Sequence, residues 1–144
     1  MFVDVRGFTR FSAQVQPEEA VSVMNEIFAP VIAAVQEHGG ILNKFIGDGL
    51  MALFGAPVPT TDHAQGAARA ALKARDAIEA LAGARRACNL DPLRIGIGLN
   101  TGEVVAGCVG TTERAEYSVI GTAVNLAARL EKTAAPGQIL LGPE

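Results

Sequence analysis

The sequence predicts an α+β fold, in which helices cover a mixed β-sheet. Short apolar runs of strand length alternate along the chain with longer stretches of helical periodicity. Two neighbouring runs are separated by Gly47-Asp48-Gly49, and Asp-Gly turns are typical of β-hairpins. A hairpin pairs its strands in antiparallel fashion, so a purely parallel sheet is excluded. The length of 144 residues fits one domain spanning residues 1–144.

The first part of the chain predicts a strand followed by helical segments. Residues 2–5 form a short apolar run, and Gly7-Phe8-Thr9 leads from it into a helical stretch, which Thr9 is suited to cap. A longer helix begins at Pro17, and we expect Pro30 to kink or split it. Its core-facing side is expected to carry the apolar residues that recur at steps of three and four: Val21, Met24, Ile27 or Phe28, Val31 and Val35.

The rest of the chain predicts the hairpin and a further series of strands and helices. The hairpin strands span residues 41–46 and 50–54, and an alanine-rich helix follows over about residues 62–86. We then expect a strand pair at residues 93–99 and 103–109, a strand at 117–120, a helix at about 122–133 and a last strand at 138–141.

Composition narrows the classes of partner. The net charge is −3 and neither sign forms a run that would suit a nucleic-acid backbone, so no nucleic-acid partner is expected. No stretch approaches the roughly 20 uninterrupted apolar residues of a membrane-spanning helix, so we expect no direct membrane contact. Cys88 and Cys108 lie far apart without CxxC spacing, which gives no support for a disulfide or zinc framework and favours a cytoplasmic location.

Two carboxylates occupy positions where a metal site can form. Asp4 ends a strand and Asp48 lies at the hairpin tip, so both can project from adjacent strand ends. Two ionised carboxylates about 4 Å apart repel by roughly 4 kcal/mol at an effective dielectric near 20, and a shared divalent cation removes that repulsion. Oxygen ligands without a nearby Cys or His cluster suit Mg²⁺ or Mn²⁺. Taken singly, each residue is also compatible with an ordinary cap or turn.

Two further groups of residues suit phosphate chemistry. Gly7-Phe8-Thr9 offers free backbone N–H groups at a helix start, where the helix dipole favours anions, although a plain tight turn has the same pattern. Asn125 and Arg129 are four residues apart and therefore share a helix face. Arginine matches phosphate oxygens in a fork, but two polar residues on a solvated face would look the same.

Two residues in apolar strands are candidates for recognising a base. Lys44 lies in the run Leu42 to Ile46, where alternation places it on the same side as those two residues. A base nitrogen could accept its hydrogen bond, although a lysine that extends to solvent at a sheet edge is commoner. Ser118 lies in another strand, and its hydroxyl can contact a base edge or bond to the backbone.

Three segments in sequence resemble the catalytic domains of class III nucleotidyl cyclases. They are residues 2–9 (FVDVRGFT), residues 43–55 (NKFIGDGLMALFG) and residues 116–129 (EYSVIGTAVNLAAR). Their order and spacing agree throughout, and three long segments are far more specific than any short motif. The resemblance implies a ferredoxin-like mixed sheet covered by helices, and it implies final strands beyond residue 144 that this chain would lack.

The resemblance also implies a role for each candidate residue. Asp4, the main-chain carbonyl of Val5 and Asp48 would bind two Mg²⁺ or Mn²⁺ ions per active site, and Gly7, Phe8 and Thr9 would hold the β- and γ-phosphates. Lys44, Ser118 and the backbone of Val119 would recognise the purine, Asn125 would orient the ribose, and Arg129 would stabilise the pentavalent phosphorus. In such cyclases one protomer supplies the metal ligands and its partner supplies the other groups, so a homodimer with shared active sites is implied.

The implied activity is that of an adenylate cyclase, which forms 3′,5′-cyclic AMP and pyrophosphate from ATP by in-line attack of the ribose 3′-hydroxyl. Similar guanylate cyclases usually have an acidic residue where Lys44 stands, which favours ATP. Many similar adenylate cyclases have Asp where this chain has Ser118, so a guanylate cyclase remains an alternative. A non-catalytic module for nucleotide binding or dimerisation is the other alternative.

Overall fold

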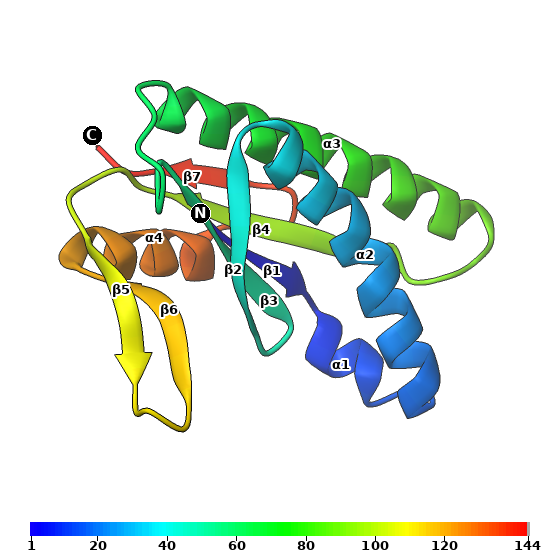
Figure 1. Cartoon of the computed structure of the whole chain (residues 1–144). Coiled ribbons are helices and arrows are strands. Elements are labelled where there is room, and N and C mark those ends of the chain that lie inside the picture. The colour runs from blue at the N-terminus through cyan, green and yellow to red at the C-terminus, as the bar shows by residue number, and fades with distance from the viewer. Residues whose placement is uncertain (144) are drawn as a thin grey trace.

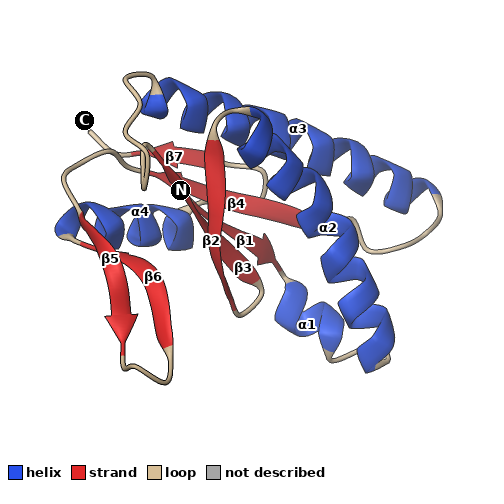
Figure 2. Cartoon of the chain, in the orientation of Figure 1, coloured by secondary structure: helices blue, strands red, loops and turns tan. Residues whose placement is uncertain are grey.

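The computed structural model describes residues 1–143, within which each expected strand and helix has a counterpart. The strands are β1 (Phe2–Arg6), β2 (Gly40–Ile46), β3 (Gly49–Phe54), β4 (Arg94–Leu99), β5 (Val105–Gly110), β6 (Ala115–Ile120) and β7 (Ile139–Leu141). The helices are α1 (Phe8–Ser12), α2 (Pro17–Glu37), α3 (His63–Ala87) and α4 (Thr122–Thr133). Figures 1 and 2 show their arrangement.

Five strands form one mixed sheet in the order β2-β3-β1-β4-β7. The pairs β2–β3, β3–β1 and β1–β4 are antiparallel, and β4 pairs with β7 in parallel. The order β4-β1-β3-β2, with helices following β1 and β3 along the chain, is that of a ferredoxin-like βαββαβ unit. The predicted α+β fold with a mixed sheet is confirmed, as is the hairpin at Gly47-Asp48-Gly49.

The expected pairing between residues 93–99 and 103–109 is wrong. β4 is flanked by β1 on one side and by β7 on the other, so neither of its edges is free for β5. β5 instead pairs with β6 in a separate two-stranded hairpin that extends away from the sheet past α4 (Figure 1). This hairpin exposes large apolar side chains, with Val105 75%, Ile120 62% and Val109 50% exposed.

The two faces of the sheet differ in the size of their side chains, as β4 shows. Ile95 and Ile97 are buried in the hydrophobic core, which they share with residues of α2 and α3. Gly96 and Gly98 point to the opposite face, because side chains alternate along a strand. A Cβ on Gly98 would collide with the backbone of Ala127 and Glu131, so the missing side chain allows α4 to lie directly on β4.

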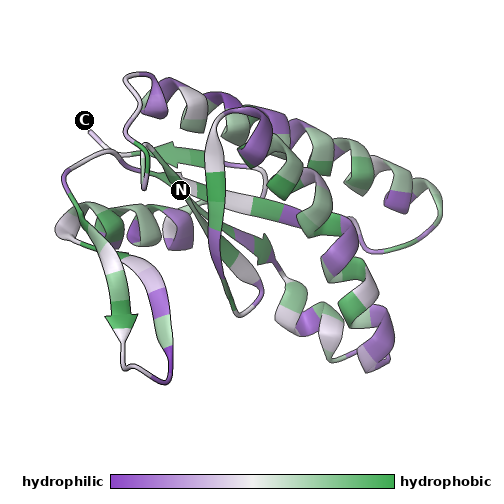
Figure 3. Cartoon of the chain, in the orientation of Figure 1, coloured by the Kyte–Doolittle hydropathy of each residue, from purple (hydrophilic) through white to green (hydrophobic). Residues whose placement is uncertain are grey.

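The core-facing side of α2 was predicted largely correctly, with one error. Val31 and Val35 are fully buried, whereas Val21 is 60% exposed and Ala20 is buried in its place. One residue turns a helix by about 100°, so Val21 lies toward solvent when its neighbour Ala20 packs against the core. Figure 3 shows that both hydrophobic and hydrophilic residues occur along α2. Of the two effects expected of Pro30, a kink or a split, the split does not occur, because α2 continues to Glu37.

None of the helices within residues 1–143 is long and apolar enough to cross a membrane. Cys88 and Cys108 are both free and exposed.

We predict that Gly98→Ala destabilises the protein, because its Cβ would push α4 off β4. The free energy of unfolding should fall by about 1–3 kcal/mol, measured by urea denaturation. Gly83→Ala is the matched control, since nothing lies within 4 Å of a Cβ at this exposed helical position. That change should stabilise by about 0.5–1 kcal/mol. Equal effects of the two substitutions would contradict the close contact between β4 and α4.

Candidate active site at the end of β1

The structure brings Asp4 and Asp48 together at one end of the central strand. Asp4 lies opposite Gly49 in the β1–β3 pair, and the N–H of Val5 donates a hydrogen bond to the carbonyl of Asp48 at 3.1 Å. A Cβ on Gly49 would lie 2.5 Å from the carbonyl oxygen of Val3 and 3.1 Å from Asp4 Oδ1. The glycine after Asp48 therefore allows the hairpin turn to approach β1 closely enough for the two carboxylates to meet.

This proximity changes the acidity of Asp4. Burial raises the pKa of Asp4 to about 7, and a hydrogen bond with Asp48 and the negative charges of Asp48 and Glu131 act in the same direction. The guanidinium of Arg6 acts in the opposite direction, by favouring the ionised form. The single cation Arg6 therefore does not offset the combined effect of burial and of the two neighbouring carboxylates on Asp4.

The donor atoms at this point fit a magnesium or manganese site that the substrate completes. Within residues 1–143 no group of three or more His, Cys, Asp or Glu residues is placed to hold a metal ion. Mg²⁺ is commonly bound by one or two carboxylates together with substrate phosphates, rather than by a full set of protein ligands. Asp4, Asp48 and the carbonyl of Val5 are hard oxygen donors of this kind. A cation would offset both the cost of burying the Asp4 charge, which is the main cause of its raised pKa, and the repulsion from Asp48 and Glu131.

The turn after β1 presents backbone N–H groups beside these carboxylates. Gly7 has a positive φ of 75° and precedes α1 as its N-cap residue, a conformation that glycine adopts without steric cost. Phe8 is buried and anchors the turn to the core, whereas Thr9 is exposed. The expectation that Thr9 caps the helix is wrong, because α1 begins at Phe8 and no side-chain cap hydrogen bond is formed. Backbone N–H groups and the exposed Thr9 hydroxyl are available to an anion at this turn.

Lys44 and Ser118 meet between β2 and the β5–β6 hairpin. Lys44 Nζ lies 3.2 Å from Ser118 Oγ and forms an ion pair with Glu116, which lowers the pKa of that carboxyl group. Asn43 fixes the same junction, because its side-chain N–H donates to the carbonyl of Tyr117 at 2.8 Å. Val119 is buried next to Ser118 on β6.

The expected orientation of Lys44 is half right, because β2 contains an irregularity. The pairing with β3 shifts register between Leu42 and Lys44, as in a β-bulge. Leu42 packs against the core, and Phe45 stacks on Phe28 of α2 with ring centroids 5.3 Å apart. Lys44 therefore lies on the same face of β2 as Ile46, which is the face away from the helices, whereas Leu42 lies on the opposite face. This orientation places the Lys44 ammonium group against β6.

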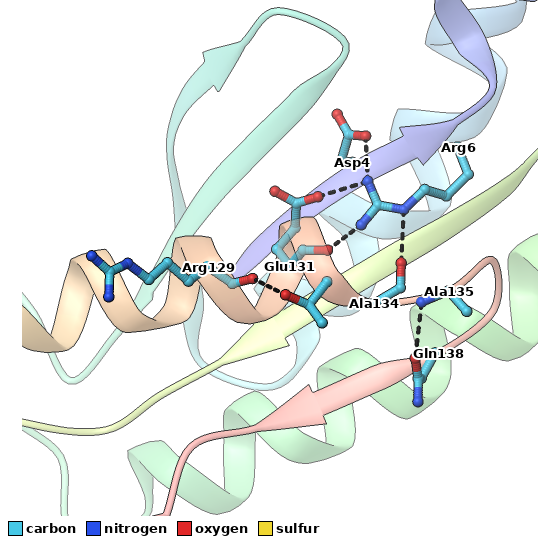
Figure 4. A network of polar contacts seen from close by, with 8 residues as sticks. Asp4, Arg6, Arg129, Glu131, Ala134, Ala135 and Gln138 are labelled. Atoms are coloured by element: carbon cyan, nitrogen blue, oxygen red, sulfur yellow. Dashed lines mark hydrogen bonds and ion pairs between the residues drawn. The ribbon is translucent and has the colours of Figure 1, made fainter.

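Asn125 and Arg129 are exposed on the same face of α4, and the structure does not bring them to the carboxylates of their own chain. Within residues 1–143 the guanidinium of Arg129 has neither an ion pair nor a hydrogen bond. In Figure 4 its side chain points away from Asp4, which lies beyond the other end of the helix segment shown. The polar groups expected to act together are thus divided between two places on one chain.

Two residues of this region were missed by the sequence analysis, namely Arg6 and Glu131. Arg6 is half-buried and lies between Asp4 and the C-terminal end of α4, and Glu131 is buried beside it (Figure 4). An arginine at the end of a strand and a glutamate near a helix end gave no sequence signal, because the contact joins residues 125 positions apart. Asn43 was missed for the same reason.

Comparison with known proteins agrees with this geometry. The family described as the adenylate and guanylate cyclase catalytic domain matches residues 1–144. The chain is 40% identical over 131 residues to Adenylate cyclase 1 of Rhizobium meliloti (strain 1021), an alignment that covers 91% of the chain but 20% of that protein. The chain therefore spans about a fifth of the length of this relative.

Solved structures give the same result. The crystal structure of the guanylyl cyclase Cya2 superposes with a TM-score of 0.89 at 39% identity, covering 97% of this chain and 71% of that one. The adenylyl cyclase CyaB from P. aeruginosa superposes with a TM-score of 0.92 at 33% identity, covering 99% and 74%. The chain belongs to the class III adenylate and guanylate cyclase catalytic domains.

We predict that Asp4→Asn stabilises the metal-free protein at pH 8. The fold raises the pKa of Asp4 to about 7, from its ordinary value of 3.8. Because the folded state then binds this proton more tightly than the unfolded state does, the free energy of unfolding of the wild-type protein falls as the pH rises between these values. The midpoint of thermal unfolding in EDTA should be higher for the variant at pH 8, and the difference should vanish toward pH 4. Asp76→Asn, on the exposed side of α3, is the control and should show no such trend. A pH-independent difference for Asp4→Asn would contradict the raised pKa.

Proposed function

We propose that the domain is an adenylate cyclase, which forms 3′,5′-cyclic AMP and pyrophosphate from ATP in a homodimer with two shared active sites. One observation carries the proposal: Arg129 points away from Asp4 within a single chain, although both belong to the groups that cyclisation needs (Figure 4). A second copy related by two-fold symmetry can supply the missing half of each site. The exposed apolar residues of the β5–β6 hairpin are suited to such a contact.

One half of each site binds cations and the triphosphate. We assign two Mg²⁺ or Mn²⁺ ions to Asp4, Asp48 and the carbonyl of Val5, and these ions, when bound, supply positive charge for the triphosphate and lower the pKa of the ribose hydroxyl. The N–H groups of Gly7, Phe8 and Thr9 donate hydrogen bonds to the β- and γ-phosphates. Their rigid placement follows from the buried Phe8 side chain and the left-handed Gly7.

The other half of each site, from the partner chain, binds the base and the reacting phosphate. Lys44 and Ser118, with the backbone of Val119, contact the purine, and Asn125 orients the ribose. The 3′-oxygen then attacks the α-phosphorus in line, forming the new P–O bond as the bond to pyrophosphate breaks. Arg129 donates hydrogen bonds to the oxygens on which negative charge develops, which stabilises the transition state.

ATP is favoured because Lys44 is a hydrogen-bond donor and N1 of adenine is an acceptor, whereas N1 of guanine carries a hydrogen and cannot accept. A specific observation supports the second candidate, a guanylate cyclase. The carboxylate of Glu116 lies beside Lys44 and Ser118, and a carboxylate can accept hydrogen bonds from the N1–H and 2-amino groups of guanine. The similar guanylyl cyclase structure is consistent with this alternative.

A non-catalytic nucleotide-binding or dimerisation module is the third candidate. It would bind ATP without releasing pyrophosphate. The presence of both carboxylates, Lys44, Asn125 and Arg129 in one chain supports a catalytic domain over it. We also propose a cytoplasmic location for the domain, because ATP is available there and two exposed free cysteines suit a reducing compartment.

We predict that catalysis is restored by mixing two inactive variants. Asp48→Ala and Arg129→Ala should each lower the rate of cyclic AMP formation at least about a hundredfold, because each disables both sites of its homodimer. Random pairing of equal amounts makes half of the dimers mixed, each with one intact site, so about a quarter of the wild-type activity should return.

The matched control is a mixture of Asp4→Ala with Asp48→Ala. Both substitutions lie in the same half of the site, so no mixed dimer has an intact site and activity should stay low. Recovery in this control, or no recovery in the first mixture, would contradict the shared sites.

We predict that the base is selected mainly by Lys44. Wild-type protein should convert ATP with a kcat/KM at least about tenfold above that for GTP, and Lys44→Ala should lower the ATP value by about 10- to 100-fold, the loss of one charged hydrogen bond. Glu116→Gln should change the ATP value by less than about threefold, since Glu116 is exposed. A preference for GTP that Glu116→Gln abolishes would establish the guanylate cyclase instead.

A further inference from the structure

Arg6 joins the metal-binding strand to the end of the helix that carries Arg129. Its Nη1 atom lies 2.7 Å from Asp4 Oδ2 and 2.9 Å from Glu131 Oε1. Its Nε donates to the carbonyl of Ala134 at 3.0 Å, and its Nη2 donates to the carbonyl of Glu131. One side chain thus contacts a carboxylate on β1 and three groups at the C-terminal end of α4 (Figure 4).

The contact is built for a guanidinium group. The carbonyls of Glu131 and Ala134 lie in the last turn of α4 and just beyond it, at the negative end of the helix dipole. The Glu131 carbonyl also accepts a hydrogen bond from the N–H of Ala134, at 3.1 Å. The side chain of Glu131 is also buried, and Arg6 is the cation next to it. A lysine has one nitrogen and cannot reach all of these acceptors together, since only the planar fork of arginine presents donors in several fixed directions.

We propose that Arg6 is a positioning residue that couples the two active sites of the dimer, an inference that rests on the proposed function. Within one chain, Asp4 serves one active site while Asn125 and Arg129 on α4 serve the other. Arg6 is bonded to both Asp4 and the end of α4, so a displacement of either changes the contacts of the other. A cation held by Asp4 would offset the negative charge that Arg6 now faces at Asp4 Oδ2, and the contacts of Arg6 with the end of α4 would change with it.

The close packing of α4 on β4 makes this link mechanically direct. No side chain separates α4 from β4 at this contact, because Gly98 lies directly against the backbone of Ala127 and Glu131. Gly96 leaves room for the guanidinium in the same way, since a Cβ there would lie 2.5 Å from Arg6 Nη2. The helix end is therefore held both by Arg6 and by its packing on Gly98.

The first test measures coupling without catalysis, by hydrogen exchange of the dimeric domain with and without Mn²⁺ and in the absence of nucleotide. Mn²⁺ should change the exchange rates of amides in residues 129–134 at least about threefold in wild-type protein, and by less than about 1.5-fold in Arg6→Lys. Arg86→Lys, an exposed position on α3, is the matched control and should behave like wild type. Glu131→Gln, which keeps the shape of the side chain, should also weaken the response of residues 129–134 to Mn²⁺. This second variant tests the same contact in case Arg6→Lys perturbs the fold.

The outcomes of this test separate the two proposals. A change at residues 4–9 and 46–50 that does not extend to residues 129–134 in wild-type protein would overturn the coupling alone. An equal response of α4 in wild type and Arg6→Lys would do the same. Absence of any response to Mn²⁺ at residues 4–9 would overturn the metal site of the proposed function, and the coupling with it.

The second test places Arg6→Lys in one chain of a mixed dimer. In the pair of Asp48→Ala and Arg129→Ala chains, the single intact site takes its carboxylates from the Arg129→Ala chain and its Asn125 and Arg129 from the other. Arg6→Lys in the Arg129→Ala chain, which supplies the working carboxylates, should raise the Mn²⁺ concentration needed for half-maximal rate. Arg6→Lys in the Asp48→Ala chain, which supplies Asn125 and Arg129, should lower kcat at least about fivefold and leave that Mn²⁺ concentration unchanged. An effect confined to the first placement would overturn the coupling.

Discussion

The position of β1 between β3 and β4 is the constraint on which the rest of the molecule depends. Its pairing with β3 brings the β2–β3 turn, and with it Asp48, to the end of β1 where Asp4 lies. Its pairing with β4 places the glycine face of the sheet under α4. The same strand leads through Gly7 into α1, so Asp4 and the Gly7 turn share one support.

Local sequence patterns were sufficient for most elements of the fold, because helices and tight turns depend on neighbouring residues. The Gly47-Asp48-Gly49 turn and the helix after Gly121 are examples. Pairing between distant strands was not accessible in this way. The partner of β5 depends on which edges of β4 remain free, and β7, which occupies one of them, lies about thirty residues further along the chain.

The residues of the candidate site can also be divided into those with a local sequence signal and those placed by contacts between distant segments. Asp4, Asp48 and the Gly7 turn were candidates because each sits at a recognisable strand end or turn, and Lys44 and Arg129 were candidates from their spacing. The resemblance to cyclases then implied a role for each of them. The surroundings of these residues were not found. The bulge in β2 determines the side to which Lys44 points. The position of α4 relative to β1 determines that Arg6 contacts Glu131. Neither feature produces a periodic pattern in the sequence.

The β5–β6 hairpin has a consequence for how such a domain can diversify. Ser118 and Glu116 lie on a two-stranded arm that contributes little to the hydrophobic core and is attached to the sheet by the side chains of Asn43 and Lys44. In the proposed function, substitutions on this arm alter the contacts with the base and leave the hydrophobic core intact. Base selectivity could then change among related domains without loss of the fold that holds Asp4 and Asp48.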